Sequence, residues 1–446
     1  MSTEGPPRGA RPPEGGGARS ALRGECEPPE GPPRGARPPQ RGGARSALRG
    51  ESTNLALASL VATSAIQVYT SFAGTAAAVL APVLARDLGI TPKWIGVFIG
   101  LVYVGGMFAS AGCGTFIRRH GAIRVSQAAV LICAAGIAAV AWTPPHGVAL
   151  AAVAAVVIGI GYGAITPASS HVLAQTTPPQ RMSLVFSIKQ TGVPAGAALG
   201  GAALPGLALA FGWRTALLGT AVAGLIVALC AEPIREALDA DRQPGLPFSF
   251  AAVAEPLAIV RRTPALARLA ALSFMYSAVQ VSLTSFIVVY LTESLHWTLV
   301  AAGFVLTLTT LAGVVGRIGW GALADRGGNP RRVLALIGVL ATLAAAAFVF
   351  ATPQWPAALI GALAAMFGAT AIGWNGVQLA EVARRAPRGK AGAVTGASGF
   401  VTFFGVVVGP PAFAALAGGG GGYGAAFALL AVLAMTGAAL SRGNSP

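Results

Sequence analysis

Twelve apolar stretches, each about 16 to 30 residues long, constrain the fold of this chain more than any other feature of its sequence. A stretch of that length crosses the hydrocarbon core of a bilayer as one α-helix. Only 10% of the residues are charged, against roughly 25% in soluble domains. The sequence therefore predicts an all-α membrane protein with twelve transmembrane helices, at 55–84, 94–116, 125–142, 148–171, 184–204, 215–230, 266–291, 300–323, 333–351, 355–379, 391–416 and 423–440.

Basic residues are distributed unequally between the loops of this predicted topology. If the helices alternate in direction, the side of the amino-terminal tail carries most of the lysine and arginine residues, and the opposite side carries only Arg86, Lys93 and Arg214. Cytoplasmic loops carry such an excess. We therefore expect both termini in the cytoplasm, and we attribute the net charge of +16 to topology and contact with membrane lipid, with no nucleic-acid partner.

A glycine-anchored corner occurs twice, 207 residues apart, at Gly114–Arg124 and Gly321–Arg332. A second pair, Pro178–Arg181 and Pro387–Lys390, repeats with nearly the same spacing. Internal repeats of this kind indicate a duplicated structural unit. We expect an amino-terminal six-helix bundle at 55–231, a cytoplasmic linker at 232–264, a second bundle at 265–441 and a short tail at 442–446.

The first 54 residues are rich in Gly, Pro and Arg, and we predict that they are disordered. Within them Gly5–Gly24 and Gly31–Gly50 are identical at 18 of 20 positions. An arginine-rich tail can contact anionic lipid. A recent duplication, or a start codon placed too far upstream, explains the repeat equally well, so the sequence leaves open whether residues 1–50 belong to the native protein.

The second corner matches a Gly-x-x-x-Asp-Arg-x-Gly signature at Gly321, Asp325, Arg326 and Gly328, and on these residues the chain resembles the major facilitator superfamily over 55–441. In the first corner Gly114 and Arg119 fit, but Arg118 stands where that family usually has the acid. The segments Ser187–Pro194 and Gly316–Gly321 are similar to bacterial organic-anion permeases, cyanate permeases and nitrate/nitrite porters.

The resemblance implies two pseudo-symmetric six-helix bundles that give alternating access to a site near the middle of the membrane, in a protein that is usually monomeric. It also implies that Asp325 and Arg326 help to hold the cytoplasmic side closed, with Gly321, Gly328 and Arg119 in the same corners. Arg118 puts the first-half counterpart of this contact in doubt. The alternative is that both corners only cap helices and set the topology.

Two basic residues lie deep within predicted helices, where each costs several kcal/mol unless pairing or function requires it. Lys189 is eight residues after Arg181, which places it roughly 12 Å into the bilayer. Arg317 is eight residues before Asp325, at a similar depth. On a helical wheel Lys189 shares a small-residue face with Gly196, so we expect it to point into protein. Two cations from opposite halves can clamp an anion.

Both cations also have a structural interpretation, in which they bond backbone carbonyls or extend to the interface. Polar residues on other predicted helices indicate a wet cavity, although interhelical hydrogen bonds explain such residues too. Among them, Gln67 and Gln280 lie in matching helices and are expected to face each other across the cavity. The full set of candidate substrate contacts is Lys189, Arg317, Gln67, Gln280, Tyr276, Tyr162 and Trp374.

No Asp or Glu lies near the middle of a predicted helix, since Glu293, Asp325 and Glu381 are all near helix ends. A dedicated buried carboxylate that carries protons is therefore missing. We expect a secondary active transporter for a small, monocarboxylate-like anion in the bacterial cytoplasmic (inner) membrane, with protons as the first candidate coupling ion and anion exchange as the second. The alternative is an efflux antiporter for drugs or metabolites.

The sequence favours no enzymatic activity. Ser169, Ser170 and His171 are consecutive, but neighbours on a helix point about 100° apart and form no catalytic pair. No cluster of Cys, His or acidic residues has metal-ligand spacing, and no cofactor motif occurs. A nutrient sensor that does not transport would normally have an additional signalling domain, and neither the tail nor the linker predicts one.

Overall fold

Helices make up the regular structure in the computed structural model of this chain, which describes residues 41–89, 93–246, 250–327 and 329–442. Among those residues no strand occurs. The chain divides into two compact units, residues 1–49 and 50–446. Twelve helices in the described part are long and apolar enough to cross a membrane. The predicted twelve-helix membrane fold is confirmed.

The first half contains six of these membrane spans. The first begins at Asn54, one residue from its predicted start. The helix that contains it, α1, starts earlier, at Arg41, within the tail that we expected to be disordered up to residue 54. Residues 1–40 lie outside the described residues. The elements of this half are α1 (Arg41–Val79), α2 (Ala81–Leu88), α3 (Lys93–His120), α4 (Ala122–Ala141), α5 (Val148–Thr176), the 3₁₀ turn η1 (Pro179–Arg181), α6 (Met182–Gln190), α7 (Gly192–Phe211) and α8 (Trp213–Cys230).

The second half repeats the arrangement with six more spans. Between the halves lie two short helices, α9 (Glu232–Leu238) and α10 (Phe250–Arg262), in the segment predicted to be a linker. The elements of the second half are α11 (Pro264–Glu293), α12 (Leu299–Arg326), α13 (Pro330–Val349), α14 (Ala357–Ala371), α15 (Asn375–Arg385), α16 (Ala391–Ala417) and α17 (Gly422–Arg442).

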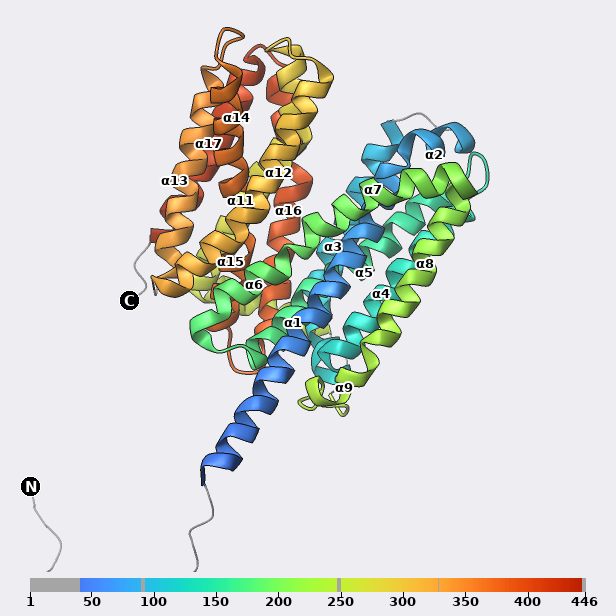
Figure 1. Ribbon diagram of the computed structural model, residues 1–446, viewed down its shortest axis with the longest axis vertical. Helices are drawn as coiled ribbons and strands as arrows, with labels where there is room; N and C mark the ends of the chain where they lie inside the picture. Colours follow the sequence, from blue (N-terminus) through green and yellow to red (C-terminus); the bar gives the residue numbers. More distant parts are fainter. Residues whose placement is uncertain (1–40, 90–92, 247–249, 328, 443–446) are drawn as a thin grey trace, which may run out of the picture. The chain divides into compact units, whose positions relative to one another are not determined.

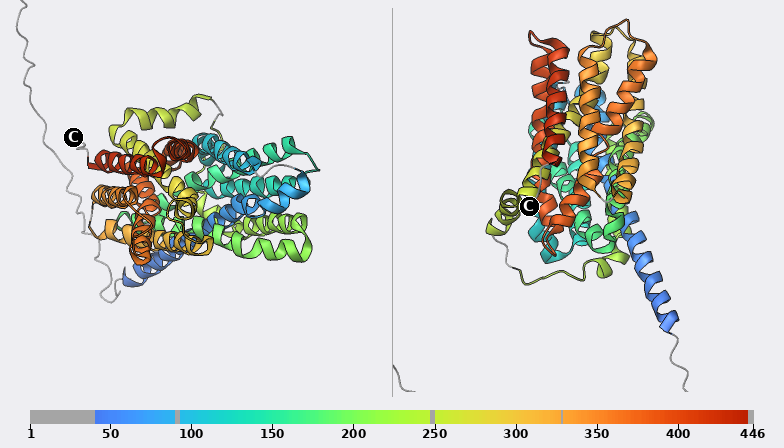
Figure 2. Two further views of the ribbon diagram at one scale, coloured as in Figure 1. Left: turned by 90° about the horizontal axis from the view of Figure 1, so that it is seen from above. Right: turned by 90° about the vertical axis from the view of Figure 1, so that its left-hand side faces the viewer.

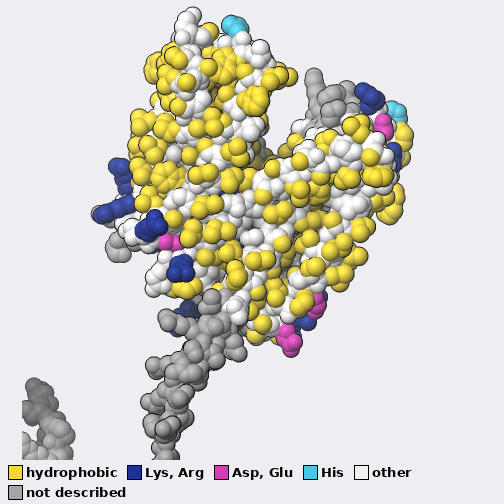
Figure 3. Space-filling model, viewed as in Figure 1, with side chains coloured by type: hydrophobic (Ala, Val, Ile, Leu, Met, Phe, Trp, Pro, Cys, Tyr) yellow, Lys and Arg dark blue, Asp and Glu magenta, His cyan; other side chains and the backbone are white. Residues whose placement is uncertain are grey.

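Within residues 50–446 the two halves form separate groups of helices that meet toward one end (Figures 1 and 2). There α6 packs against α12 and α15, and α16 packs against α3 and α5. We call this end the latch side; it contains the carboxyl ends of α3, α5 and α12 and the amino ends of α6 and α16. At the opposite end the surface is hollowed between the two groups (Figure 3). The halves are therefore closed together on the latch side and apart on the other.

The outer surface is apolar along the middle of the helices, and charged side chains gather near the ends (Figure 3). Large hydrophobic side chains such as Leu209, Phe304 and Val315 are exposed by 89, 72 and 70%. In water such a surface would aggregate, whereas in a bilayer it contacts lipid tails. The distribution agrees with a membrane-embedded protein.

Two of the twelve spans are interrupted near their middle. The fifth span breaks at Thr191, between α6 and α7, and the tenth breaks at residues 372–374, between α14 and α15. Pro194 has no N–H, so the carbonyl of Gln190, four residues earlier, lacks its helical donor. At Gly373 a β-carbon would lie 2.2 Å from the carbonyl oxygen of Ala369, so only glycine fits this turn. Backbone carbonyls at the two breaks, those of Gln190 and Ile372, are therefore able to accept hydrogen bonds from side chains.

Glycines also bring the halves into direct contact at the two repeated corners. A β-carbon at Gly114 of α3 would lie 2.5 Å from the β-carbon of Ala393 on α16. One at Gly321 of α12 would lie 2.5 Å from Oγ of Ser187 on α6. The duplicated glycines thus allow the same close approach of helices in both halves.

Candidate functional site

Arg317 on α12 connects the two helix breaks. Its Nε donates a hydrogen bond of 2.9 Å to the carbonyl of Ile372, at the break in the tenth span. Its Nη1 donates to the carbonyl of Gln190, which Pro194 leaves without a helical donor. Arg317 is only 2% exposed. Because Gln190 belongs to the first half, this one guanidinium holds the two halves together deep inside the protein.

Lys189 on α6 is also 2% exposed and is bonded to two amide side chains. Its Nζ donates to Oε1 of Gln67 at 2.6 Å and to Oε1 of Gln190 at 3.0 Å. Within the described residues, the hydrogen bonds of Lys189 and Arg317 all go to uncharged oxygens, and neither forms an ion pair. Burying a charge without a counter-charge costs several kcal/mol. The centre of the protein therefore carries an excess of positive charge.

A cavity of about 140 Å³ lies beside these cations, and both halves contribute to its walls. The described residues that line it include no Asp or Glu. The guanidinium of Arg317 is the one cationic group in this lining, and the other polar groups are amides and hydroxyls. The walls also contain four aromatic rings, from Tyr103, Tyr162, Trp374 and Phe403. A small solute with one negative charge and an apolar body would find complementary groups here.

The predicted substrate contacts occupy two layers. Arg317, Gln280, Tyr162 and Trp374 line the cavity, whereas Lys189 and Gln67 are absent from its lining. The latter two reach it through Gln190, which bonds Lys189 and itself lines the cavity. Gln67 and Gln280 consequently do not face each other across the cavity, because the amide of Gln67 is engaged with Lys189.

Tyr276 points away from the cavity. Its hydroxyl donates to the carbonyl of Leu334 on α13 at 2.8 Å. Its ring lies edge-on to Trp374 with 5.7 Å between centroids. Trp374 in turn donates from Nε1 to Oε1 of Gln280 at 3.2 Å, and Asn375 donates to the same oxygen at 3.0 Å. In this structure Tyr276 supports the wall behind Trp374 and does not reach the cavity.

Sequence reasoning missed Gln190, Asn375, Tyr103 and Phe403. Gln190 had a readable signal, because the i to i−4 rule makes its carbonyl the one that Pro194 leaves unbonded. Tyr103 and Phe403 lie on α3 and α16, and their rings are 6.2 Å apart across the boundary between the halves. No pattern within one helix predicts a pair formed between helices 300 residues apart in the sequence.

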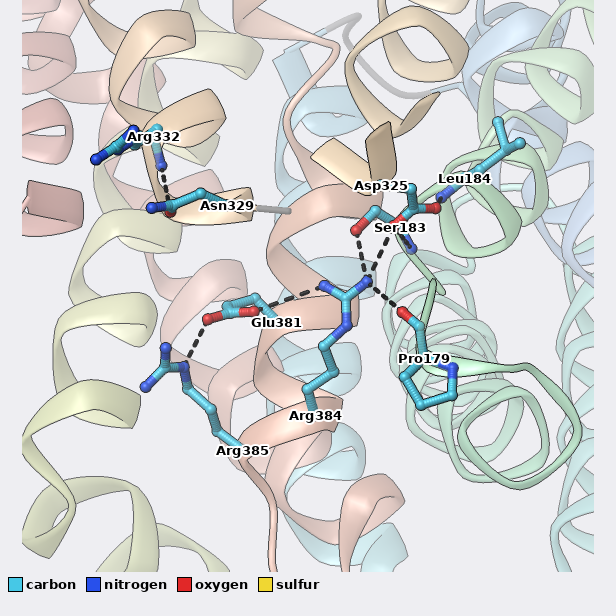
Figure 4. Close-up of polar contacts among 9 residues, drawn as sticks. All are labelled: Pro179, Ser183, Leu184, Asp325, Asn329, Arg332, Glu381, Arg384 and Arg385. Carbon is cyan, nitrogen blue, oxygen red and sulfur yellow. Dashed lines mark hydrogen bonds and ion pairs between the residues drawn. The ribbon is translucent and has the colours of Figure 1, made fainter. Parts of the chain in front are cut away.

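The latch between the halves is centred on Asp325 at the end of α12 (Figure 4). Its Oδ1 accepts from the backbone N–H of Ser183 at 3.0 Å, and its Oδ2 accepts from that of Leu184 at 2.8 Å. Both N–H groups lie in the first turn of α6, where backbone donors have no acceptor within the helix. The acid of the second half therefore caps a helix of the first half. Arg384 of α15 pairs with the same carboxylate at 3.0 Å.

Arg384 contacts residues of both halves in addition to Asp325 (Figure 4). It donates to Oγ of Ser183 at 2.9 Å and to the carbonyl of Pro179 at 3.1 Å, both in the first half. Glu381, one turn earlier on α15, lies 3.6 Å from it and pairs with Arg385 at 2.6 Å. Arg384 is a further residue that the sequence analysis did not select.

The other predicted gating residues contribute less to this contact. Gly321 allows the close approach of α12 to Ser187 described above. Arg326 is exposed, and Arg119 is partly buried beside a shallow surface pocket with Phe116 and His120. Gly328 lies outside the described residues. Asp325 and Arg384 therefore provide the charged contact between the halves at this corner.

Among the described residues, no side chain caps a helix across the halves at the first corner, where Arg118 replaces the acid. The amino end of α16 has no side-chain hydrogen bond to its backbone. The nearby Asp239 instead caps α4, accepting from the N–H groups of Ile123 and Arg124 at 2.8 and 3.0 Å. Burial raises the pKa of the Asp239 carboxyl, and those two N–H donors oppose the rise. Both capped residues belong to the first half, so Asp239 does not connect the halves.

At the first corner, an acidic residue of the linker forms an ion pair with the second half. Glu255 on α10 accepts from Nζ of Lys390, at the start of α16, at 2.5 Å. The hydrogen bond from Lys390, with the added attraction of that ammonium and of Arg118, lowers the pKa of the Glu255 carboxyl. Helix α10 packs against both α3 and α16. The linker thus places an acid between the basic corner of the first half and the second half.

Comparison with known families decides what kind of protein this is. The sequence model of the Major Facilitator Superfamily matches residues 62–410. The chain belongs to this superfamily. The family consists of transporters, so this major facilitator protein is a multi-pass membrane transporter.

Two curated relatives illustrate the sequence similarity. An uncharacterized MFS-type transporter of Mycobacterium tuberculosis is 28% identical over 183 residues, which cover 41% of this chain and 40% of the relative. The 4-hydroxybenzoate transporter PcaK of Pseudomonas aeruginosa is 29% identical over 150 residues, 34% of this chain and 33% of the relative. These alignments span less than half of each relative's length.

Solved structures share the fold of this major facilitator protein over nearly their whole length. The fucose:proton symporter FucP of E. coli superposes with a TM-score of 0.70 at 16% identity, covering 86% of this chain and 97% of FucP. The human organic anion transporter MFSD10 superposes with a TM-score of 0.72 at 17% identity, covering 86% of this chain and 98% of MFSD10. At such low identity the likeness establishes the fold alone.

Proposed function

We propose that this protein is a secondary active transporter for a small organic anion, and that the anion binds in the cavity beside Arg317. The observation that carries the proposal is the uncompensated positive charge at the centre, where Arg317 and Lys189 are buried and bonded only to uncharged oxygens. An anion would supply the missing charge. The similarity to a 4-hydroxybenzoate transporter supports the same class of solute.

Arg317 can couple binding of the anion to movement of the halves. In this structure its Nη1 is bonded to the carbonyl of Gln190 in the first half. A carboxylate is a stronger acceptor than a carbonyl for a guanidinium, because the hydrogen bond is charge-assisted on both sides. A substrate carboxylate at Arg317 would compete with Gln190 and weaken one connection between the halves.

The Asp325 corner is the second connection in this proposal. Alternating access requires the latch side to open while the other side closes. Opening would release the carboxylate of Asp325 from the N–H groups of Ser183 and Leu184, which belong to the opposite half from α12. Arg384 lies in the same half as Asp325, and opening would break its bonds to Ser183 and Pro179 of the first half. Asp325 and Arg384 thus stabilise the conformation observed here, and Gly321 sets how closely the helices can approach.

We infer that the latch side faces the cytoplasm and that the protein lies in the cytoplasmic membrane. Most basic loop residues are on this side, as the positive-inside rule requires of cytoplasmic loops. No carboxylate lines the described part of the cavity. A coupling proton would therefore use a group other than a buried acid in that lining, such as the substrate itself.

Ligand-dependent thermal stability of the purified protein tests the proposal. Sodium benzoate, acetate and nitrate are compared with uncharged benzamide at constant ionic strength. A ligand at about 100 times its Kd stabilises the folded state by about 2.7 kcal/mol, so binding appears as a rise in Tm. We expect at least one anion to raise the Tm of the unaltered protein and benzamide to leave it unchanged.

Variants assign the effect to the cavity. Arg317→Gln removes the charge and should abolish the anion-dependent rise, whereas Arg317→Lys keeps the charge but loses the planar fork and should retain a smaller rise. Lys189→Gln gives a second variant if Arg317→Gln does not fold. Arg235→Gln, at an ion pair with Glu232 on the linker helix α9, is the matched control. An undiminished rise in both Arg317→Gln and Lys189→Gln refutes the proposed site.

A further inference from the structure

We propose that the transported anion is a monocarboxylate with a single aromatic ring. This inference rests on the proposed function and specifies the substrate class of the same cavity. Its basis is the combination of one guanidinium, unpaired amide donors and a wall of aromatic side chains in a small space. Each of these properties excludes a different class of solute.

The aromatic wall is assembled from both halves. The ring of Phe403 on α16 lies 6.2 Å from that of Tyr103 on α3 and 6.1 Å from that of Tyr162 on α5. These separations are within the range of favourable aromatic contacts, and the Phe403–Tyr162 pair is edge-to-face. Trp374 adds a fourth ring to the lining. A planar ring entering the cavity would join this cluster, whereas a sugar-like or highly hydrated body would lose hydrogen bonds to water there.

The charge of the lining fits one carboxylate. Arg317 is the one cation among the described residues that line the cavity, since Lys189 lies behind Gln190. A guanidinium presents parallel N–H groups that match the two oxygens of one carboxylate. A dicarboxylate would place its second charge against aromatic, aliphatic or uncharged polar walls. Desolvating that charge without a partner would be unfavourable.

The amides around Arg317 present donors to the cavity. Oε1 of Gln190 is occupied by Lys189, and Oε1 of Gln280 accepts from both Trp374 and Asn375. Among the described residues, the hydrogen bonds of these two side chains use their oxygens, and their NH₂ groups remain available. Both residues line the cavity. Donors grouped with a guanidinium complement the lone pairs of a carboxylate and do not suit an ammonium.

The volume limits the body of the substrate. At about 140 Å³ the cavity is well below the roughly 300–1,000 Å³ of sites for drug-sized ligands. Such a space favours a single ring over a fused polycyclic anion. The class that satisfies size, charge and wall chemistry together is the benzoate-like carboxylate.

Equilibrium binding to the purified full chain tests this inference with matched probes. Benzoate is compared with cyclohexanecarboxylate, which has the same charge on a saturated ring, with benzamide, which has the ring without the charge, and with the dicarboxylate phthalate. We expect benzoate to bind about 2- to 13-fold more tightly than cyclohexanecarboxylate, which corresponds to the 0.5–1.5 kcal/mol that aromatic pairs add. We expect no binding of benzamide or phthalate under the same conditions.

Two adjacent phenylalanines on α16 provide a matched pair of variants. Phe403→Leu removes the ring that meets Tyr103 and Tyr162 and should bring the ratio of the two affinities close to one, with cyclohexanecarboxylate still bound. Phe404→Leu alters a side chain that is 48% exposed and absent from the cavity lining, and should leave the ratio unchanged.

The possible results separate this inference from the proposed function. If cyclohexanecarboxylate binds as tightly as benzoate in the unaltered protein, or if phthalate binds as tightly as benzoate, the aromatic monocarboxylate class is wrong while anion binding stands. If Phe403→Leu leaves the ratio intact, the assignment of the aromatic wall is wrong. If none of the carboxylates binds, both the inference and the proposed function fail.

Discussion

Removing the charge of Asp325 should shift this protein strongly toward the conformation in which the latch side is open. The carboxylate accepts from two backbone N–H groups of α6 and from Arg384, at 2.8 to 3.0 Å, and its side chain is only 9% exposed. Hydrogen bonds to charged groups contribute about 1.5–3 kcal/mol each. Asp325→Asn keeps one neutral acceptor and loses the charge and the second acceptor, so we estimate a loss of about 2–3 kcal/mol.

That loss corresponds to a change of roughly 30- to 160-fold in the ratio of latched to open molecules. Distances between spin labels across the latch side measure the ratio. Glu236 on α9, which packs against α4 and α8 of the first half, and Arg332 on α13 of the second half are exposed, and no contact joins either of them to Asp325. Labels at Glu236→Cys and Arg332→Cys, in a background without the native cysteines, should report a larger population at long distance in Asp325→Asn.

Glu232→Gln is the control for this experiment. Glu232 is an acid on the same side whose partners Arg124, Gln127 and Arg235 do not belong to the second half. Its substitution should leave the distance distribution as in the parent. An Asp325→Asn distribution indistinguishable from the parent, with Glu232→Gln also unchanged, would show that the carboxylate caps α6 without holding the halves together, and the reasoning would be refuted.

Two further predictions concern the same side of the molecule. Gly321→Ala should destabilise the latched conformation by about 1–3 kcal/mol, because the added β-carbon would meet Ser187 and overpack the contact. Gly319→Ala on the same helix is the control, because its β-carbon would meet open space. Thermal denaturation and label distances compare the two variants, and equal effects would contradict the prediction. Glu255→Gln should shift the latched-to-open ratio by at most about 5-fold, because exposed ion pairs such as Glu255–Lys390 contribute only about 0.2–1 kcal/mol. The same label distances measure this ratio. A shift as large as that of Asp325→Asn would contradict the prediction. Because the pKa of Glu255 is lowered, this ion pair should persist at neutral pH and be lost only as the pH falls below the roughly 4.3 of an unperturbed glutamate.

Much of the fold could be predicted because membrane helices are encoded locally. A run of about 20 apolar residues specifies a span without reference to the rest of the chain. The repeated corners at Gly114 and Gly321 predicted a duplication, and both glycines lie at close contacts between the halves. The helical rise placed Lys189 and Arg317 at depth, and both are buried.

The arrangement of the candidate site could be predicted only in part. Depth along a helix follows from the sequence, but the partner that a side chain meets depends on the rotation and packing of a neighbouring helix. The sequence therefore selected Tyr276 and Gln67, whose contacts in the structure are with Leu334 and Lys189, and it missed Phe403 and Asn375.

The sequence by itself determined how many membrane spans the described part of this protein has, which of their ends are basic, and that two cations lie within the apolar region. Only the tertiary structure decided that Arg317 bonds the carbonyl freed by Pro194, and that Asp325 caps a helix of the other half. The first set of properties depends on residues within one turn or one span of each other. The second depends on helices from different halves, whose relative position is set by the packing of the whole unit.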